Sequence, residues 1–261
     1  MRIMNENVDL AVARQDNPST AGDKSDGARV RSRSQAEDTY QVLRREILSC
    51  SIAPGSKILI GDICARLGFS SGAVREALSR LSAEGLAVAE PQKGFRAAPI
   101  SMGDLMDLTC ARGHLESLCL TEAMDKGGVA WEGSVLAAHH ALSLTPMLAT
   151  PDSKWMSEEW SFAHNHFHEV IAAGCGSHWL LRIRSALYEQ SERYRRLSLP
   201  LDPAKRDVGA EHRAICDAVI GRDKDLATRL MKEHIFRTAE IIRNGFEKIL
   251  PDEIDRSHSR S

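Results

Sequence analysis

The stretch from Ile60 to Phe95 constrains the fold of this 261-residue chain more than any other segment. Apolar residues at helical spacing predict a short helix that ends at Gly68, because glycine readily caps a helix C-terminus. A second helix is predicted from about Ser70, and a β-hairpin with its tip at residues 92–94 follows it. A helix-turn-helix with a hairpin wing is a device for reading the major groove of DNA.

By composition and periodicity the whole chain divides into two predicted domains, each with a tail beside it. Residues 1–34 are rich in Ser, Asp, Gly and Arg and lack apolar periodicity, which predicts a disordered tail. Residues 35–98 are expected to form the winged helix-turn-helix domain, and residues 99–250 an all-helical antiparallel bundle. A flexible tail is expected over residues 251–261. The predicted fold class is therefore mostly α, with β structure confined to the small wing.

The charge distribution fits a nucleic-acid-binding module joined to an acidic domain. Between Arg29 and Ala98 there are eleven basic and seven acidic residues, whereas the whole chain carries a net charge of −2. Ordinary charge scatter is the alternative interpretation. No window approaches the roughly 18 apolar residues of a membrane-spanning helix. Six cysteines without a C-x-x-C pair favour reduced thiols, and the N-terminus has no secretory leader, so a cytoplasmic protein is expected.

The predicted winged helix-turn-helix domain, residues 35–98, resembles the winged-helix domain of GntR-type bacterial transcription regulators. The residues that carry the resemblance are Tyr40-x-x-Leu43-Arg44-x-x-Ile47, Pro54-Gly55, Leu67-Gly68, Val74-Arg75-Glu76-Ala77-Leu78, Leu81, Glu84-Gly85-Leu86 and Gly94. The resemblance implies a double-stranded DNA operator as partner. The DNA contacts that it implies are Ser70, Ser71, Gly72, Arg75, Lys93 and Gly94.

Two positions depart from the family pattern. The family usually has Arg where this chain has Ser71, and Pro where it has Ala73. Operator specificity is therefore expected to rest more on Arg75 and on the wing. In the alternative interpretation, Arg75 does no more than solvate its helix beside Glu76.

Four histidines of the predicted helical bundle, residues 99–250, fall on apolar helical faces. His164 and His168 lie one turn apart on one predicted helix, while His212 and His234 lie on the last two helices. Imidazoles that converge in a helical bundle are natural ligands for Zn²⁺ and similar ions. A histidine on such a face can also be a core residue whose hydrogen bonds are satisfied, so a purely structural bundle is the alternative.

Arg112 lies within the apolar face of the helix that Ser101 is expected to cap. A buried arginine is costly unless it is paired. Its guanidinium suits the carboxylate of an effector, which makes Arg112 a candidate effector-binding residue. An intrahelical pair with Glu116, four residues on, is the other possibility.

The predicted helical bundle, residues 99–250, resembles the helical FCD effector domain of the FadR-like branch of the same family. The resemblance rests on Arg112-x-x-Leu115-Glu116, Phe167-His168, Glu211-His212-x-x-Ile215 and Met231-x-x-His234. It implies an Asp-His-His-His metal site in which His164 stands where the family has Asp. A four-histidine site would favour Zn²⁺ or Ni²⁺. Alternatively His164 does not bind the ion, leaving three histidines with water or effector. Residues 175–177 and 191–196 also resemble a subgroup that responds to small dicarboxylates.

These expectations combine into a homodimeric repressor of a catabolic operon that binds a pseudo-palindromic operator and senses a small carboxylate at a metal site. The expected location is the bacterial cytoplasm, with the protein on the nucleoid when bound to DNA. Two alternatives are a metal-ion sensor and a metal-dependent α-helical hydrolase with an appended DNA-binding module. Against the hydrolase, the sequence has no H-E-x-x-H motif and no evident general base beside the histidines, so no enzyme is expected.

Overall fold

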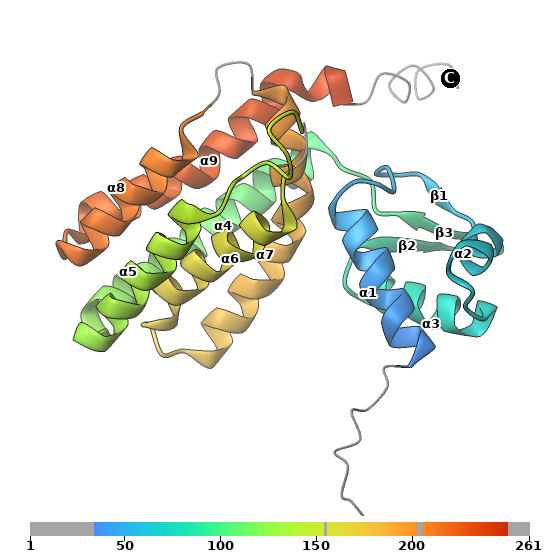
Figure 1. Ribbon diagram of the computed structural model, residues 1–261, viewed down its shortest axis with the longest axis horizontal. Coiled ribbons are helices and arrows are strands. Elements are labelled where there is room, and N and C mark those ends of the chain that lie inside the picture. The colour runs from blue at the N-terminus through green and yellow to red at the C-terminus, as the bar shows by residue number, and fades with distance from the viewer. Residues whose placement is uncertain (1–33, 154–155, 203–205, 250–261) are drawn as a thin grey trace, which may run out of the picture. The chain divides into compact units, whose positions relative to one another are not determined.

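The computed structural model describes residues 34–153, 156–202 and 206–249, with side chains up to residue 245 (Figure 1). The tails predicted over residues 1–34 and 251–261 lie outside the described residues, apart from Ser34. No helix within the described residues is both long and apolar enough to cross a membrane. All six cysteines are free thiols, and three of them are buried: Cys119, Cys175 and Cys216.

The N-terminal part forms a winged helix-turn-helix. Its elements are α1 (Gln35–Leu48), β1 (Lys57–Ile58), α2 (Ile60–Leu67), α3 (Ser71–Ala83), β2 (Ala87–Glu90) and β3 (Gly94–Ala97). The strands form an antiparallel sheet in the order β1-β3-β2. The β2–β3 hairpin agrees with the sequence prediction, whereas β1 was not predicted, because two residues are too few to show an alternating pattern.

Local sequence signals set the geometry of the helix-turn-helix. Gly68 ends α2 in the left-handed conformation at φ +70°, which a residue with a side chain adopts only with strain. The Ser70 hydroxyl then accepts a hydrogen bond of 3.3 Å from the backbone N–H of Ala73, which caps α3. Both signals agree with the predicted helix boundaries. Together they fix the turn that presents the first residues of α3.

One compact core supports this domain. Leu43 of α1 packs against Val74, Leu78 and Leu81 of α3, and none of these four side chains is exposed. Truncating any of them to alanine would cost about 2–5 kcal/mol. The outer face of α3 is thereby held rigidly with respect to α1.

The C-terminal part is a helical bundle. Its helices are α4 (Met102–Lys126), α5 (Val129–Leu144), α6 (Glu158–Ala173), α7 (His178–Ser198), α8 (Val208–Ile220) and α9 (Lys224–Ile249), with a short 3₁₀ turn, η1 (Leu199–Leu201). Helix α4 packs against α6, α7 and α9, while α5 packs on α6 and α8. The mostly helical fold class predicted from the sequence is confirmed.

Two details of the bundle differ from expectation. Helix α6 begins at Glu158 and not near Ser153, because the Ser157 hydroxyl accepts a hydrogen bond of 2.9 Å from the N–H of Trp160. The buried face of α4 is not the apolar face predicted from the sequence, which included Arg112. It includes the buried carboxylate of Glu116, which a search for apolar periodicity cannot select.

Candidate metal centre and DNA-binding surface

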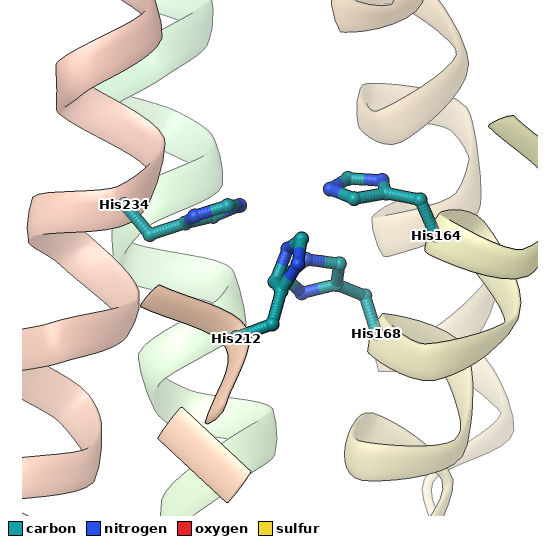
Figure 2. A group of neighbouring side chains, drawn as sticks. All are labelled: His164, His168, His212 and His234. Atoms are coloured by element: carbon teal, nitrogen blue, oxygen red, sulfur yellow. The ribbon is translucent and has the colours of Figure 1, made fainter. Parts of the chain in front are cut away.

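The four histidines come together inside the bundle, although they belong to three helices (Figure 2). His164 and His168 project from α6, His212 from α8 and His234 from α9. Each offers one ring nitrogen, and these atoms all lie within 4.8 Å of one another. The ring centroids of the six pairs are 4.6–5.8 Å apart. The imidazoles are thus near enough for small side-chain rotations to let them share one ion.

Several ring nitrogens of this cluster have no hydrogen-bond partner among the described residues. Both nitrogens of His168 and Nε2 of His212 are buried and unpartnered. Leaving a buried polar atom unpaired costs about 1–3 kcal/mol. Histidines that were only core residues would be expected to find partners, so these orphaned nitrogens fit a bound cation.

Burial keeps the four imidazoles neutral, which is the protonation state that binds metal. Desolvation lowers the pKa of His164, His168 and His212 well below the ordinary histidine value, and the neighbouring imidazoles lower these pKa values further. Desolvation also lowers the pKa of His234, although Glu211 opposes the shift. At neutral pH the four rings are therefore uncharged, and each keeps a lone pair for coordination.

His234 is oriented by a carboxylate that sequence analysis did not assign to the site. Its Nδ1 lies 2.8 Å from Oε2 of Glu211, and Nε of Arg206 donates to the other Glu211 oxygen at 2.6 Å. Burial alone would raise the pKa of Glu211, but hydrogen bonds from Arg206 and His234 lower it to about 2. The ionised carboxylate therefore favours an Nδ1–H tautomer of His234, which leaves Nε2 as the metal-binding atom.

His164 is oriented by a phenol. Its Nδ1 lies 2.8 Å from the hydroxyl of Tyr188 on α7. Burial raises the pKa of Tyr188 to about 12, so this hydroxyl stays protonated. His164 can bind an ion through Nε2 when Nδ1–H donates to the phenol oxygen.

Arg112 lies close to the histidines and is only partly paired. It donates to Oγ of Ser191 at 2.8 Å, whereas its separation from Glu116 is 3.5 Å. Glu116 is held more closely by Arg184, whose Nε lies 2.9 Å from the carboxylate. The intrahelical pair considered from the sequence thus exists as a long contact. Arg112 keeps an unpartnered Nε and an incompletely balanced charge.

A cavity of about 540 Å³ opens beside the cluster and is called the wide cavity below. His164 and His234 line it, together with Arg195 and Arg206. This volume suits a small metabolite. Most of the remaining wall is apolar and includes Met147, Leu148, Met156, Trp160, Leu199 and Ile241.

The predicted DNA contacts lie on the outer surface of the helix-turn-helix and wing. Ser70, Ser71, Gly72, Arg75 and Lys93 are exposed. Gly94 is half-buried in the wing turn, at φ +96°. Within the described residues neither the Arg75 nor the Lys93 side chain has an ion-pair or hydrogen-bond partner. By contrast, Arg66 pairs with Glu46 and Arg80 with Glu37. Arg75 is therefore free to contact a base or a phosphate.

Comparison with known proteins identifies the family. The model for bacterial regulatory proteins of the gntR family matches residues 35–96, and the FCD domain model matches residues 107–237. Over 211 residues the chain is 37% identical to the HTH-type transcriptional regulator BphR of Paraburkholderia xenovorans, covering 81% of this chain and 86% of that protein. The chain belongs to the GntR family. It is a DNA-binding transcription regulator with an FCD effector domain, and not an enzyme.

Two further relatives support the same family and fold. The HTH-type transcriptional repressor GlaR of Escherichia coli is 36% identical over 215 residues, which cover 80% of this chain and 96% of GlaR. The solved structure of E. coli McbR/YncC superposes with a TM-score of 0.64, covering 82% of this chain and 99% of that one. At 17% identity this second likeness supports the fold alone.

Sequence reasoning missed the polar residues that surround the four histidines of this GntR-family regulator. Glu211 stands next to His212 in the quoted motif, but nothing in its spacing shows that it reaches His234. Tyr188, Arg184 and Arg206 come from segments remote in sequence, so only the packing of α7 and of the α7–α8 connection brings them to the site. The one feature of the sequence that could have indicated these polar residues is the large number of arginines on α7.

The lowered pKa values of the cluster predict how the stability of the metal-free protein depends on pH. Above about pH 6.5 the histidines are neutral in both the folded and the unfolded state, so stability should not change with pH on their account. As the pH falls below this value, the four histidines bind protons in the unfolded state but stay neutral in the folded state. The free energy of unfolding should then fall by up to about 1.4 kcal/mol per pH unit for each histidine.

Urea denaturation of the chelated protein at a series of pH values measures this slope. The variant His168→Gln should show a shallower slope below neutrality than the unsubstituted protein. The control His114→Gln removes an imidazole from the exposed face of α4 and should leave the slope unchanged. Equal slopes for the unsubstituted protein and His168→Gln would contradict the assignment of buried neutral imidazoles.

Proposed function

We propose that this GntR-family regulator is a repressor of a catabolic operon that senses a small carboxylate at a four-histidine metal site. One observation carries the proposal: four neutral imidazoles, three of whose buried nitrogens lack partners, converge beside a metabolite-sized cavity in an FCD domain. The relative GlaR, named a transcriptional repressor, supports repression as the mode of action.

His164, His168, His212 and His234 would hold the ion. An all-nitrogen set without a carboxylate favours Zn²⁺ or Ni²⁺ over harder cations. Bound there, such an ion supplies a Lewis-acidic position for a carboxylate oxygen. The protein fixes the donors through Glu211 and Tyr188, and by linking α6, α8 and α9 the site would tie three segments of the bundle together.

Arg112 is proposed to receive the effector. Its guanidinium adjoins the cluster, and its unpartnered Nε and incompletely balanced charge suit a carboxylate. Burial lowers the pKa of Arg112, and an anion beside it would oppose that shift. Effector binding would then stabilise one arrangement of the bundle. Allostery requires that this arrangement also differ in its affinity for the operator.

On the DNA side, a homodimer is proposed to place two α3 helices in successive major grooves of a pseudo-palindromic operator. Ser70, Ser71, Gly72, Arg75, Lys93 and Gly94 are the proposed contacts. A dimer surface is supported by large apolar side chains that are exposed on the neighbouring helices α4 and α7: Leu118, Trp179 and Ile183. The proposed location is the bacterial cytoplasm, on the nucleoid when bound to DNA.

Arg75→Ala should weaken operator binding by about 1–3 kcal/mol, because of the two exposed arginines of α3 it removes the one that is not paired with a carboxylate among the described residues. Binding is measured by fluorescence anisotropy at fixed salt, with a DNA fragment that the unsubstituted protein selects from a random library. Arg213→Ala, which removes the same charge from the exposed surface of α8, is the control and should bind normally. Unchanged affinity for Arg75→Ala would overturn the recognition-helix assignment.

Removing two of the proposed ligands should abolish metal binding. Plasma mass spectrometry of the purified protein should find one ion per chain in the unsubstituted protein and almost none in His168→Ala/His212→Ala. The matched control His114→Ala/His166→Ala removes two exposed imidazoles and should keep the ion. Circular dichroism verifies that each variant is folded. Full metal content in the first variant would rule out this site.

A titration with zinc alone distinguishes the proposal from the metal-sensor alternative. The metal-free protein is loaded with Zn²⁺ in the presence of operator DNA and without any organic acid. Under the proposal, the operator stays bound until a carboxylate is added. Release or capture of the operator by zinc alone would show that the ion itself is the signal.

A further inference from the structure

Two cavities of very different size meet at the histidine cluster. Both are lined by His164, Arg195, His234 and Thr238. The second cavity, called the head chamber below, is also lined by Arg112 and measures only about 30 Å³, against about 540 Å³ for the wide cavity. A space of that size holds little more than one or two water molecules. The head chamber can take a single carboxylate group, and the rest of any ligand must occupy the wide cavity.

The head chamber adjoins an excess of buried positive charge. Arg112 and Arg184 share one carboxylate, that of Glu116. Arg112 also donates to the neutral hydroxyl of Ser191 and lies over the ring of Tyr188, while Nε of Arg112 and Nη2 of Arg184 have no hydrogen-bond partner among the described residues. A buried cation without a full counter-charge is costly, so an anionic group is stabilised here.

The wide cavity has no such excess. Of the arginines that line it, Arg206 pairs with Glu211, and Arg195 pairs with Glu192, although Nε of Arg195 has no hydrogen-bond partner among the described residues. Glu192 also pairs with Arg196, which has a second carboxylate partner in Glu158. The carboxylate of Asp202 also faces this cavity, where it accepts a hydrogen bond from the backbone N–H of Arg206 at 2.6 Å. A second carboxylate on a ligand would therefore lose its hydration in the wide cavity, where both lining arginines are already ion-paired and the carboxylate of Asp202 would repel it.

Apolar side chains form most of the wall of the wide cavity. Trp160, Met156 and Ile241 contribute to it from α6, from the segment before α6 and from α9. Apolar surface of a ligand buried against these side chains is stabilised in proportion to its area. The two cavities thus require different chemistry at the two ends of one ligand.

We infer that the effector is a monocarboxylate with an apolar body. Its carboxylate lies at the histidines, toward Arg112, and its alkyl or aryl body fills the wide cavity. This inference rests on the proposed carboxylate sensing and narrows it. The inferred ligand differs from the small dicarboxylates that the resemblance of residues 175–177 and 191–196 implies.

Hexanoate and adipate test the inference as a matched pair, because a second carboxylate in adipate replaces the terminal methyl of hexanoate. Isothermal titration calorimetry with the zinc-loaded full chain should show hexanoate binding at least about tenfold more tightly than adipate. The variant Arg112→Gln should weaken both acids by a similar factor, because both place a carboxylate in the head chamber.

The variant Ile241→Lys adds a cation to the wall of the wide cavity. It should strengthen adipate binding, weaken hexanoate binding and so lower their affinity ratio by at least about tenfold. Leu136→Lys, on the exposed face of α5, is the control and should leave the ratio unchanged.

The outcomes separate this inference from the proposed function. Tighter binding of adipate than of hexanoate by the unsubstituted protein would overturn the inference and leave carboxylate sensing intact. An unchanged ratio in Ile241→Lys would show that the body of the ligand does not enter the wide cavity, and would also overturn it. Failure of both acids to bind the zinc-loaded chain would count against the proposed function itself.

Discussion

The burial of four neutral imidazoles at one point is the constraint on which the effector domain depends. His164, His168, His212 and His234 come from three helices and are all buried. Both ring nitrogens of His168 and Nε2 of His212 have no hydrogen-bond partner among the described residues. Such a cluster is unfavourable by itself, because unpaired polar atoms are expensive in a protein interior. A divalent ion bound by all four histidines would satisfy one nitrogen of each ring with a coordinate bond. The placement of α6 relative to α8 and α9 would then depend on metal occupancy.

The surrounding charges act with this cluster. Glu211 favours one ring tautomer of His234 and Tyr188 hydrogen-bonds to His164, while Arg112 and Arg184 leave positive charge near the cluster. A histidine at position 164 also removes the negative charge that an aspartate would bring. The site consequently attracts an anion more strongly than a site containing a carboxylate would. This connects the composition of the proposed ligand set to the chemistry of the effector.

The sequence predicted the parts of the structure that local rules determine. Gly68 and Ser70 mark the helix-turn-helix because their conformational roles are nearly independent of context. The four histidines could be placed together because each lies on an apolar helical face. The contacts of Glu116 and Glu211 were not predictable, since they depend on how distant helices are rotated and packed. Both cavities likewise arise only from the assembled bundle.

X-ray absorption spectroscopy of the zinc-loaded protein without effector tests the central claim most directly. Coordination by all four histidines predicts a first shell of nitrogen atoms at about 2.0–2.1 Å, with outer-shell scattering from four imidazole rings. A shell of three imidazoles and one oxygen would show that one of the four histidines does not bind the ion, and the same spectrum from His164→Ala would identify it as His164. Any sulfur ligand, or zinc with fewer imidazoles still, would contradict a metal centre at this cluster.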